Sequence, residues 1–89
     1  MTNLLAVVTA YCLASQPCAS GSWPHIGMVA APKSIPFGTH VLIEGREFVV
    51  EDRMGRAYPD GWDIWMPTEK ECRQFGRKKL MITILNKGH

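Results

Sequence analysis

Apolar and polar residues alternate along several short stretches of this chain, a pattern typical of strands that bury one face. In the stretch Glu47–Asp52, the alternation places Phe48, Val50 and Asp52 on one face and Val49 and Glu51 on the other. Patterns and apolar runs of this kind predict six strands, over Asn3–Cys12, Gly27–Ala31, His40–Ile43, Glu47–Asp52, Trp62–Met66 and Leu80–Leu85. Turn-forming residues fill the connections Leu13–His25 and Lys33–Thr39, Glu44–Arg46 is a tight turn, and Asn86–His89 is predicted to be a tail.

One short helix is predicted between the last two strands. Pro67 opens it, and Thr68 is its expected N-cap. Glu69 and Glu71 lie in the first turn, where the helix dipole favours acidic side chains, and Gly76 ends the helix. We expect the helix to have about two turns.

Six short strands and one helix in 89 residues predict a single domain over residues 1–89 that is mainly β. Strands this short cannot form a stable open sheet with both faces in water. A small closed barrel removes the sheet edges and gives every strand one inward face. The pattern therefore predicts a six-stranded β-barrel with one short helix.

Two aspartates, Asp52 and Asp63, lie at the inner ends of two apolar runs in Val49–Met66, with a polar loop between them. A strand ending in Asp, a turn-rich loop and a strand starting with Asp predict a hairpin-like unit with both carboxylates at one end of the sheet. Paired carboxylates are the groups that general acid and base catalysis requires. The alternative is that both residues simply cap the turns they border.

Composition and charge exclude several classes. With 46% apolar and 20% charged residues, the chain is not of the disordered class. A net charge of +2 is too small to predict nucleic-acid binding, and the run Arg77–Lys79 is interpreted as a solvated strand end. The apolar N-terminal run has no preceding Lys or Arg and is too short to cross a bilayer. We therefore expect no signal peptide, no membrane insertion and synthesis in the cytoplasm.

Three cysteines give an odd count. Cys12 and Cys18 are close enough in sequence for a local disulfide, and Cys72 is expected to be a small buried residue of the helix. A zinc site from Cys12, Cys18, His25 and His40 is conceivable, but the spacing matches no tight ligand pattern. We expect neither a metal site nor a cofactor.

The order of several short motifs resembles that of the 3D domain, a three-aspartate domain of cell-wall lytic enzymes. This domain is related to the C-terminal part of membrane-bound lytic transglycosylase A and to the barrel of expansins and rare lipoprotein A. The matching segments are Thr9–Tyr11, Gly27–Ala30, Ile35–Thr39, Gly45 with Glu51–Asp52, Asp52 and Asp63 eleven residues apart, Ile64–Met66 and Phe75–Arg77. They span roughly residues 8–85, and the resemblance implies a double-psi β-barrel.

The chain departs from the family pattern in two places. Ala31-Pro32 replaces an Asp-Pro pair, so one of the three aspartates that give the family its name is missing. Met54-Gly55, preceded by Arg53, replaces the glycine pair that follows the first loop aspartate. The departures bear on the activity and not on the fold.

The resemblance implies a lytic transglycosylase that cuts the bond between N-acetylmuramic acid and N-acetylglucosamine in peptidoglycan. Asp63 is then the general acid and base, and Asp52 is the neighbouring charge that raises its pKa. The expected substrate-binding residues are Thr9, Tyr11, Trp65 and Arg53, with Trp23 a second candidate platform for sugar and Arg56 a second candidate for peptide or lactyl carboxylates.

Two other functions use the same barrel. One is a non-catalytic, expansin-like module that grips glycan, and the other is a phage structural protein that has kept only the shape. The missing aspartate at Ala31 favours these two, whereas Asp52 and Asp63 at the family spacing favour the enzyme. We expect a monomer whose partner is the glycan strands of peptidoglycan, and which is encoded by a bacteriophage and delivered to the cell wall.

Overall fold

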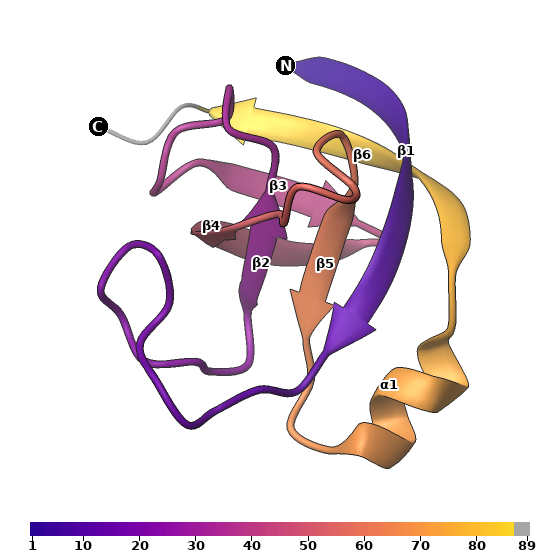
Figure 1. Cartoon of the computed structure of the whole chain (residues 1–89). Coiled ribbons are helices and arrows are strands. Elements are labelled where there is room, and N and C mark those ends of the chain that lie inside the picture. The colour runs from indigo at the N-terminus through magenta and orange to yellow at the C-terminus, as the bar shows by residue number, and fades with distance from the viewer. Residues whose placement is uncertain (87–89) are drawn as a thin grey trace.

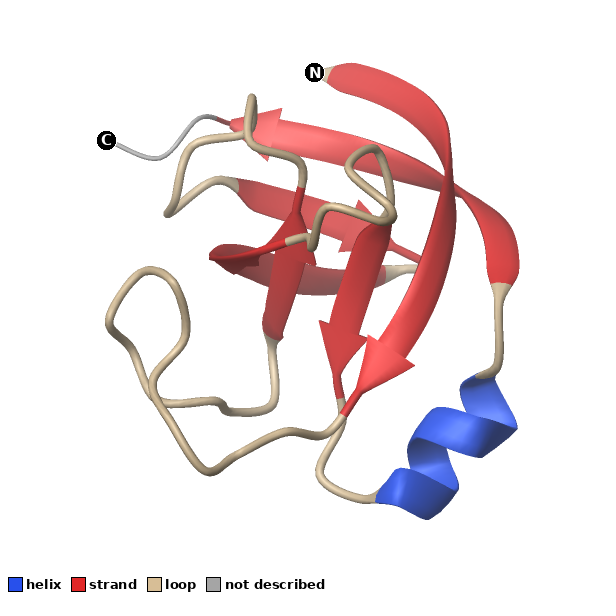
Figure 2. Cartoon of the chain, in the orientation of Figure 1, coloured by secondary structure: helices blue, strands red, loops and turns tan. Residues whose placement is uncertain are grey.

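Six strands of the chain close into a barrel, with one helix outside it (Figures 1 and 2). The computed structural model describes residues 1–86. The elements are β1 (Thr2–Tyr11), β2 (Met28–Ala31), β3 (His40–Ile43), β4 (Arg46–Arg53), β5 (Trp62–Trp65), α1 (Glu69–Phe75) and β6 (Lys78–Asn86). The predicted mainly β barrel with one short helix is confirmed. The tail was predicted to begin at Asn86, but Asn86 is the last residue of β6. The rest of the predicted tail, residues 87–89, lies outside the described residues.

Around the barrel the strand order is β1-β5-β2-β4-β3-β6. Two of the pairs, β1 with β5 and β2 with β4, are parallel, and the other four pairs are antiparallel. The hairpin-like unit predicted for Val49–Met66 is therefore wrong, because β2 lies between β4 and β5 and pairs with both. The finer assignment to a double-psi barrel stays a prediction.

The barrel interior is filled by the inward face of each strand. Its fully buried side chains include Val8, Val29, Val41, Ile43, Val50, Trp62 and Ile82. The alternation predicted for β5 is observed, since Trp62 and Ile64 are buried while Asp63 and Trp65 are only partly covered. The strand β5 therefore directs Trp62 and Ile64 into the barrel and Asp63 and Trp65 outward.

Local signals in the sequence place the turn and the helix close to their predicted positions, except that Arg46, predicted to be in the turn, is the first residue of β4. The two-residue turn between β3 and β4 has positive φ at both Glu44 (52°) and Gly45 (77°), the conformation that a tight hairpin requires. The side chain of Thr68 accepts a hydrogen bond from the backbone N–H of Glu71, and Gly76 ends α1 with a φ of 71°. α1 lies outside the barrel against β1 and buries no residue completely, so the expected burial of Cys72 is wrong.

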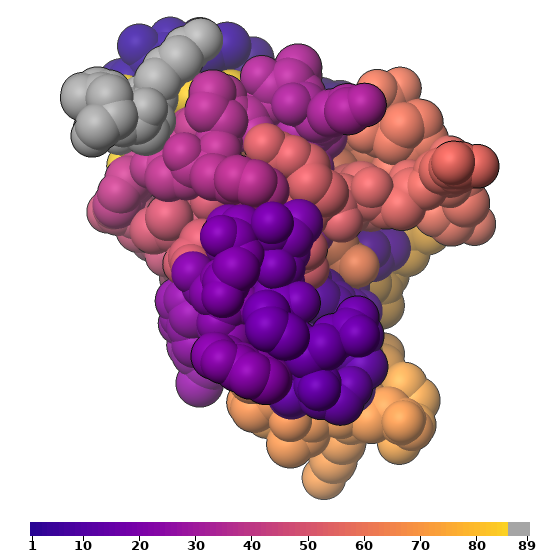
Figure 3. All heavy atoms as spheres, turned by 60° about the vertical axis from the view of Figure 1, so that its left-hand side comes forward, coloured from indigo at the N-terminus to yellow at the C-terminus, as the bar shows by residue number. Residues whose placement is uncertain are grey.

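The loop between β1 and β2 is the longest connection and projects from one side of the barrel (Figures 1 and 3). Its backbone is tied to β4 by a hydrogen bond from Ser20 N to the carbonyl of Glu51 (3.2 Å). The side chain of His25 adds a contact of 2.8 Å between Nε2 and Oε2 of Glu51. The loop is thus held against the end of β4 that carries Asp52.

Candidate functional site

Asp52 and Asp63 lie at one level of the barrel wall, on either side of β2. The register pairs Thr9 of β1 with Asp63 of β5, Asp63 with Ala30 of β2, and Ala30 with Asp52 of β4. Because neighbouring strands are about 4.8 Å apart, the two aspartate Cα atoms are separated by roughly 10 Å. A β-bulge beside Val29 and Ala30 gives β4 one extra residue here, which re-aims the end of that strand.

Asp63 lines a cleft of about 780 Å³ on the surface of the molecule. The floor and walls come from β1, β5, the start of β6 and the loop from Met54 to Gly61. The hydroxyl of Thr9 donates a hydrogen bond of 3.0 Å to Oδ1 of Asp63. Within residues 1–86 no hydrogen bond reaches Oδ2, so this oxygen is available to a ligand.

The surroundings of Asp63 shift its acidity in the direction that an acid catalyst needs. Burial raises the pKa of Asp63 by desolvating its charged form, and the hydrogen bond from Thr9 opposes this effect. The negative charge of Asp52 raises the pKa further. Asp63 therefore keeps its proton to a higher pH than a carboxyl in water.

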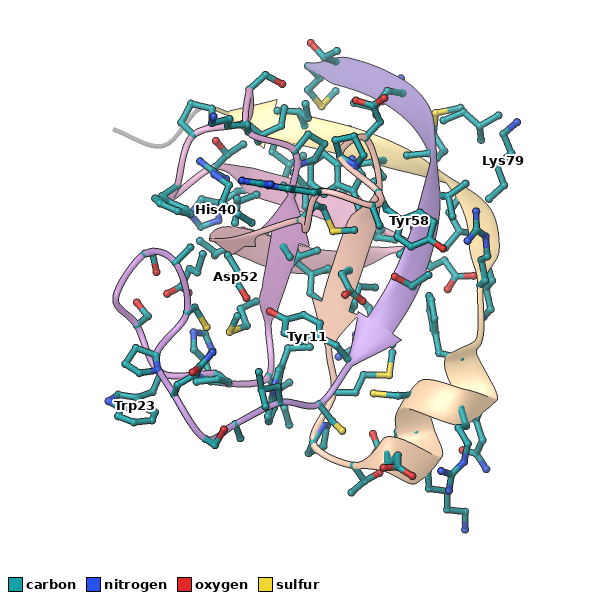
Figure 4. The ribbon with its side chains drawn as sticks, viewed as in Figure 1. Tyr11, Trp23, His40, Asp52, Tyr58 and Lys79 are labelled. Atoms are coloured by element: carbon teal, nitrogen blue, oxygen red, sulfur yellow. The ribbon has the colours of Figure 1, made fainter. Side chains whose placement is uncertain are left out.

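Three residues of the cleft were not predicted from the sequence. Tyr58, with 59% of its surface exposed, lies on the loop before β5, and the guanidinium of Arg77 is 5.4 Å from its ring centroid. Lys79 pairs with Val7 on β1, two residues before Thr9, and lines the same cleft. Figure 4 shows Lys79 and Tyr58 on the same side of the barrel. The period-2 pattern of β1 places Val7 on the same face as Thr9, but the pairing of Lys79 with Val7 follows only from the register of β1 with β6.

Asp52 has a different environment. It accepts hydrogen bonds from the hydroxyl of Tyr11 (2.8 Å), from the backbone N–H of Ala19 (3.0 Å) and from the backbone N–H of Arg53 (2.9 Å). Figure 4 shows Tyr11 and Asp52 directed toward each other. Both line a separate hollow of about 280 Å³ beneath the loop between β1 and β2. Asp52 thus anchors this loop and does not line the Asp63 cleft, although its charge still acts on Asp63.

Burial, with the hydrogen bond to Asp52 as the second cause, raises the pKa of Tyr11 far above its ordinary value. The phenol therefore stays protonated and donates to Asp52 at any physiological pH. Of the expected substrate-binding pair, Thr9 reaches Asp63 and Tyr11 reaches Asp52.

The other predicted binding residues lie away from Asp63. Trp65 is register-paired with Tyr11, donates its indole N–H to the carbonyl of Leu13 (2.9 Å) and does not border the cleft. Trp23 is 61% exposed on the far side of the loop between β1 and β2 (Figure 4). Arg53 stacks over the ring of Phe37, with its guanidinium carbon 3.9 Å from the ring centroid, beside a third hollow.

The residues named for a zinc site are engaged elsewhere or apart. His25 contacts Glu51, His40 contacts Glu47 at 2.7 Å, and Cys12 and Cys18 are free thiols. Within residues 1–86 no three His, Cys, Asp or Glu side chains are grouped so that they could hold a metal ion. In the same part of the chain, no helix has the length and apolar character that crossing a membrane requires.

In comparisons with known proteins, no family model, curated protein or solved structure matches this chain. The resemblance to the 3D domain, which depends on the short motifs in the sequence, stays a prediction.

Proposed function

We propose that this chain is a lytic transglycosylase of peptidoglycan, with Asp63 as the single general acid and base. The observation that supports this most is the partly buried carboxyl of Asp63, whose pKa is raised, in the wall of an open cleft. The cleft volume of about 780 Å³ is within the range of small-molecule and sugar sites. A raised pKa is the property that lets a carboxyl donate a proton near neutral pH.

In the proposed reaction, the protonated carboxyl of Asp63 gives its proton to the glycosidic oxygen through Oδ2, while Thr9 holds Oδ1. The bond from that oxygen to C1 of the N-acetylmuramic acid breaks. The resulting carboxylate then takes the proton of the 6-hydroxyl of the same sugar, and that oxygen bonds to C1 to close a 1,6-anhydro ring. No water enters the reaction, so one carboxyl serves as acid and then as base.

This scheme tolerates the missing family aspartate. Ala31 is fully buried and belongs to β2, whose four residues are all buried. The methyl group at this position is part of the core and supplies no acid. A hydrolase needs a second carboxyl to activate water or to attack the sugar, whereas the transglycosylase reaction does not.

The remaining cleft residues suit an anionic sugar polymer. Tyr58 offers an exposed aromatic ring against which a sugar can pack, and the guanidinium of Arg77 lies 5.4 Å from the centroid of that ring. Arg77 and Lys79 lie on the β6 side of the cleft, where they can pair with lactyl or peptide carboxylates.

A glycan-binding module without catalysis is the second candidate. It is favoured by the position of Asp52 outside the cleft, which leaves Asp63 and the exposed Asp60 as the carboxyls that line it within residues 1–86. Such a module would use Tyr58, Arg77 and Lys79 in the same way. It would differ only in leaving the glycan intact.

The test is digestion of purified peptidoglycan by the wild-type chain, Asp63→Asn and the matched variant Asp60→Asn, with the soluble products identified by mass spectrometry. We expect 1,6-anhydromuramic products from the wild type and from Asp60→Asn, and a loss of about 10²–10⁴-fold in rate for Asp63→Asn. Reducing ends would indicate a hydrolase. Intact sacculi that bind the wild-type chain would indicate the binding module, and neither cutting nor binding would leave a structural role.

A further inference from the structure

The third hollow, which Arg53 borders, adjoins the Asp63 cleft and carries only positive charge. Its volume is about 430 Å³, and its lining contains three cationic side chains, Lys33, Arg53 and Arg56, and no acidic one. The cleft, in contrast, has Asp60 and Asp63 beside Arg77 and Lys79. We refer to the hollow lined by Lys33, Arg53 and Arg56 as the cationic hollow.

The charges of the cationic hollow are not neutralised from within the described part of the chain. None of its three cations forms an ion pair there, whereas the acidic groups of Glu44, Glu47, Glu51 and Glu69 all have cationic or histidine partners elsewhere. Asp52 precedes Arg53 in sequence, but its carboxylate is held by Tyr11 and two backbone N–H groups and lines another hollow. The cationic hollow is therefore a concentrated positive site in a chain whose net charge is only +2.

One of these cations is held in place for binding. The guanidinium of Arg53 is stacked 3.9 Å from the centroid of the Phe37 ring. The Nη1 of Arg53 donates a long hydrogen bond of 3.5 Å to the carbonyl of Asp52, and its other guanidinium N–H groups form no hydrogen bond within residues 1–86, so they can donate in the plane of the guanidinium. A planar guanidinium edge of this kind matches the oxygen pairs of carboxylate and phosphate.

The cationic hollow and the Asp63 cleft share a wall. Met54, Gly55 and Pro59 border both, so the loop between β4 and β5 separates the two sites. A polymer chain lying in the cleft can reach across this loop with a side branch. A free anion would be held by charge attraction alone. A branch of a polymer that is already bound in the cleft would be present at high effective concentration beside the hollow, which strengthens its binding.

We propose that the cationic hollow binds an anionic branch of the wall polymer, a carboxylate or phosphate group, while the glycan lies in the Asp63 cleft. The choice of polymer rests on the proposed function, but the anion site rests on Lys33, Arg53 and Arg56 themselves. Two sources provide this chemistry in a cell wall: the carboxylates of the stem peptides and the phosphates of polymers attached to the glycan.

The test is co-sedimentation with purified sacculi in the Asp63→Asn background, so that cleavage does not confuse binding. The variant Lys33→Gln/Arg56→Gln removes two exposed cations from the cationic hollow, and Lys70→Gln/Arg73→Gln on α1 removes the same two residue types at a distance. We expect about tenfold weaker binding, with a shallower salt dependence, for the first variant and little change for the second. Equal affinities for the two variants at matched thermal stability would overturn the proposal.

Treated sacculi identify the source of the anion. If removal of wall phosphate polymers abolishes the difference between the two variants, the branch is a phosphate. If amidation of the stem-peptide carboxylates abolishes it, the branch is a carboxylate. A difference that persists through both treatments overturns the proposal of an anion site.

The experiments distinguish a failure of the proposed activity from a failure of the proposed anion site. Sacculi that the wild-type chain binds but does not cut, with the expected loss in Lys33→Gln/Arg56→Gln, would overturn the activity and support the cationic hollow. Normal cutting by the wild-type chain, with no loss of binding in Lys33→Gln/Arg56→Gln, would overturn only the cationic hollow.

Discussion

Thr9 and Asp63 are register partners in the parallel pair of β1 and β5, and the Thr9 hydroxyl donates a hydrogen bond of 3.0 Å to the Asp63 carboxyl. A donor of this kind favours the charged carboxylate, so it lowers the pKa of Asp63 against the larger effect of burial. Thr9 thus limits how far the pKa rises. It also fixes Oδ1 of Asp63, while Oδ2 forms no hydrogen bond within residues 1–86.

Replacing Thr9 by Val should therefore move the pH dependence of activity upward. An acid catalyst must be protonated in the free enzyme, so kcat/KM falls as the pH rises through the pKa of Asp63. Without the Thr9 hydroxyl this pKa rises, and the alkaline limb of kcat/KM shifts to higher pH. The measurement is a pH–rate profile on soluble glycan strands. Thr83→Val on β6 is the control, and a limb in Thr9→Val that coincides with the control would contradict the assignment.

Replacing Asp52 by Asn should move the same limb in the opposite direction. The negative charge of Asp52 raises the pKa of Asp63, so its removal lowers that pKa and shifts the alkaline limb of kcat/KM to lower pH. Because Asn keeps one acceptor oxygen, we expect the loop between β1 and β2 to stay attached. A limb that does not move would exclude Asp52 as the charge that tunes the acid.

Asp52 should also contribute measurably to stability, as the anchor of that loop. Asp52→Ala removes the acceptor of three hydrogen bonds, from Tyr11, Ala19 and Arg53. Hydrogen bonds to charged groups contribute about 1.5–3 kcal/mol each when buried, and these are partly exposed, so we expect a loss of roughly 2–3 kcal/mol in the free energy of unfolding. Chemical denaturation measures it, with Asp60→Ala as the control. A loss no larger than that of the control would show that Asp52 does not anchor the loop.

Much of the fold could be predicted because its signals are local. The alternation of β5, the turn at Glu44 and Gly45, and the Thr68 and Gly76 caps of α1 each depend on a few neighbouring residues. The pairing of strands is not local, and this is where the prediction for Val49–Met66 is wrong. Apolar runs identify β4 and β5 as strands but do not reveal that β2 lies between them.

In the candidate site too, features with local sequence signals could be predicted and features that depend on tertiary structure could not. Asp63 and its outward direction could be predicted from strand alternation, and the cleft agrees with them. The separation of Asp52 from that cleft could not, because it depends on the bulge and on the loop that folds over Asp52. Tyr58 was missed because it lies in an irregular loop, where periodicity carries no information. Lys79 was missed because its partner on β1 follows only from the register of β1 with β6.

The acidity of Asp63 also predicts how the stability of the chain depends on pH. A carboxyl whose pKa is higher in the folded state binds more protons folded than unfolded, so stability falls as the pH rises from the ordinary Asp value of 3.8 through the raised value. Asp63→Asn removes this loss and keeps an acceptor for Thr9. We expect its melting temperature to equal or exceed that of the wild type at pH 7, with the difference smaller at pH 3. A collapse of the variant at pH 7 would instead identify Asp63 as structural.

The imidazole of His25 predicts a second pH dependence, at higher pH. Its Nδ1 lies 2.9 Å from the carbonyl of Ile26 and its Nε2 lies 2.8 Å from Glu51, so both ring nitrogens face acceptors. Since only the protonated ring donates from both nitrogens, the carbonyl of Ile26 first and Glu51 second raise the pKa of His25.

A raised histidine pKa stabilises the folded chain fully below the ordinary value of 6.5, and this contribution is lost as the pH rises through the folded value. We therefore expect the melting temperature of the wild type to decline above pH 6.5 more steeply than that of His25→Gln. The side chain is half exposed, so the effect should be small and should weaken in high salt. His40→Gln provides a control at the other histidine–glutamate contact. Parallel melting curves for the wild type and His25→Gln between pH 6 and pH 9 would show that His25 does not hold the loop through its charge.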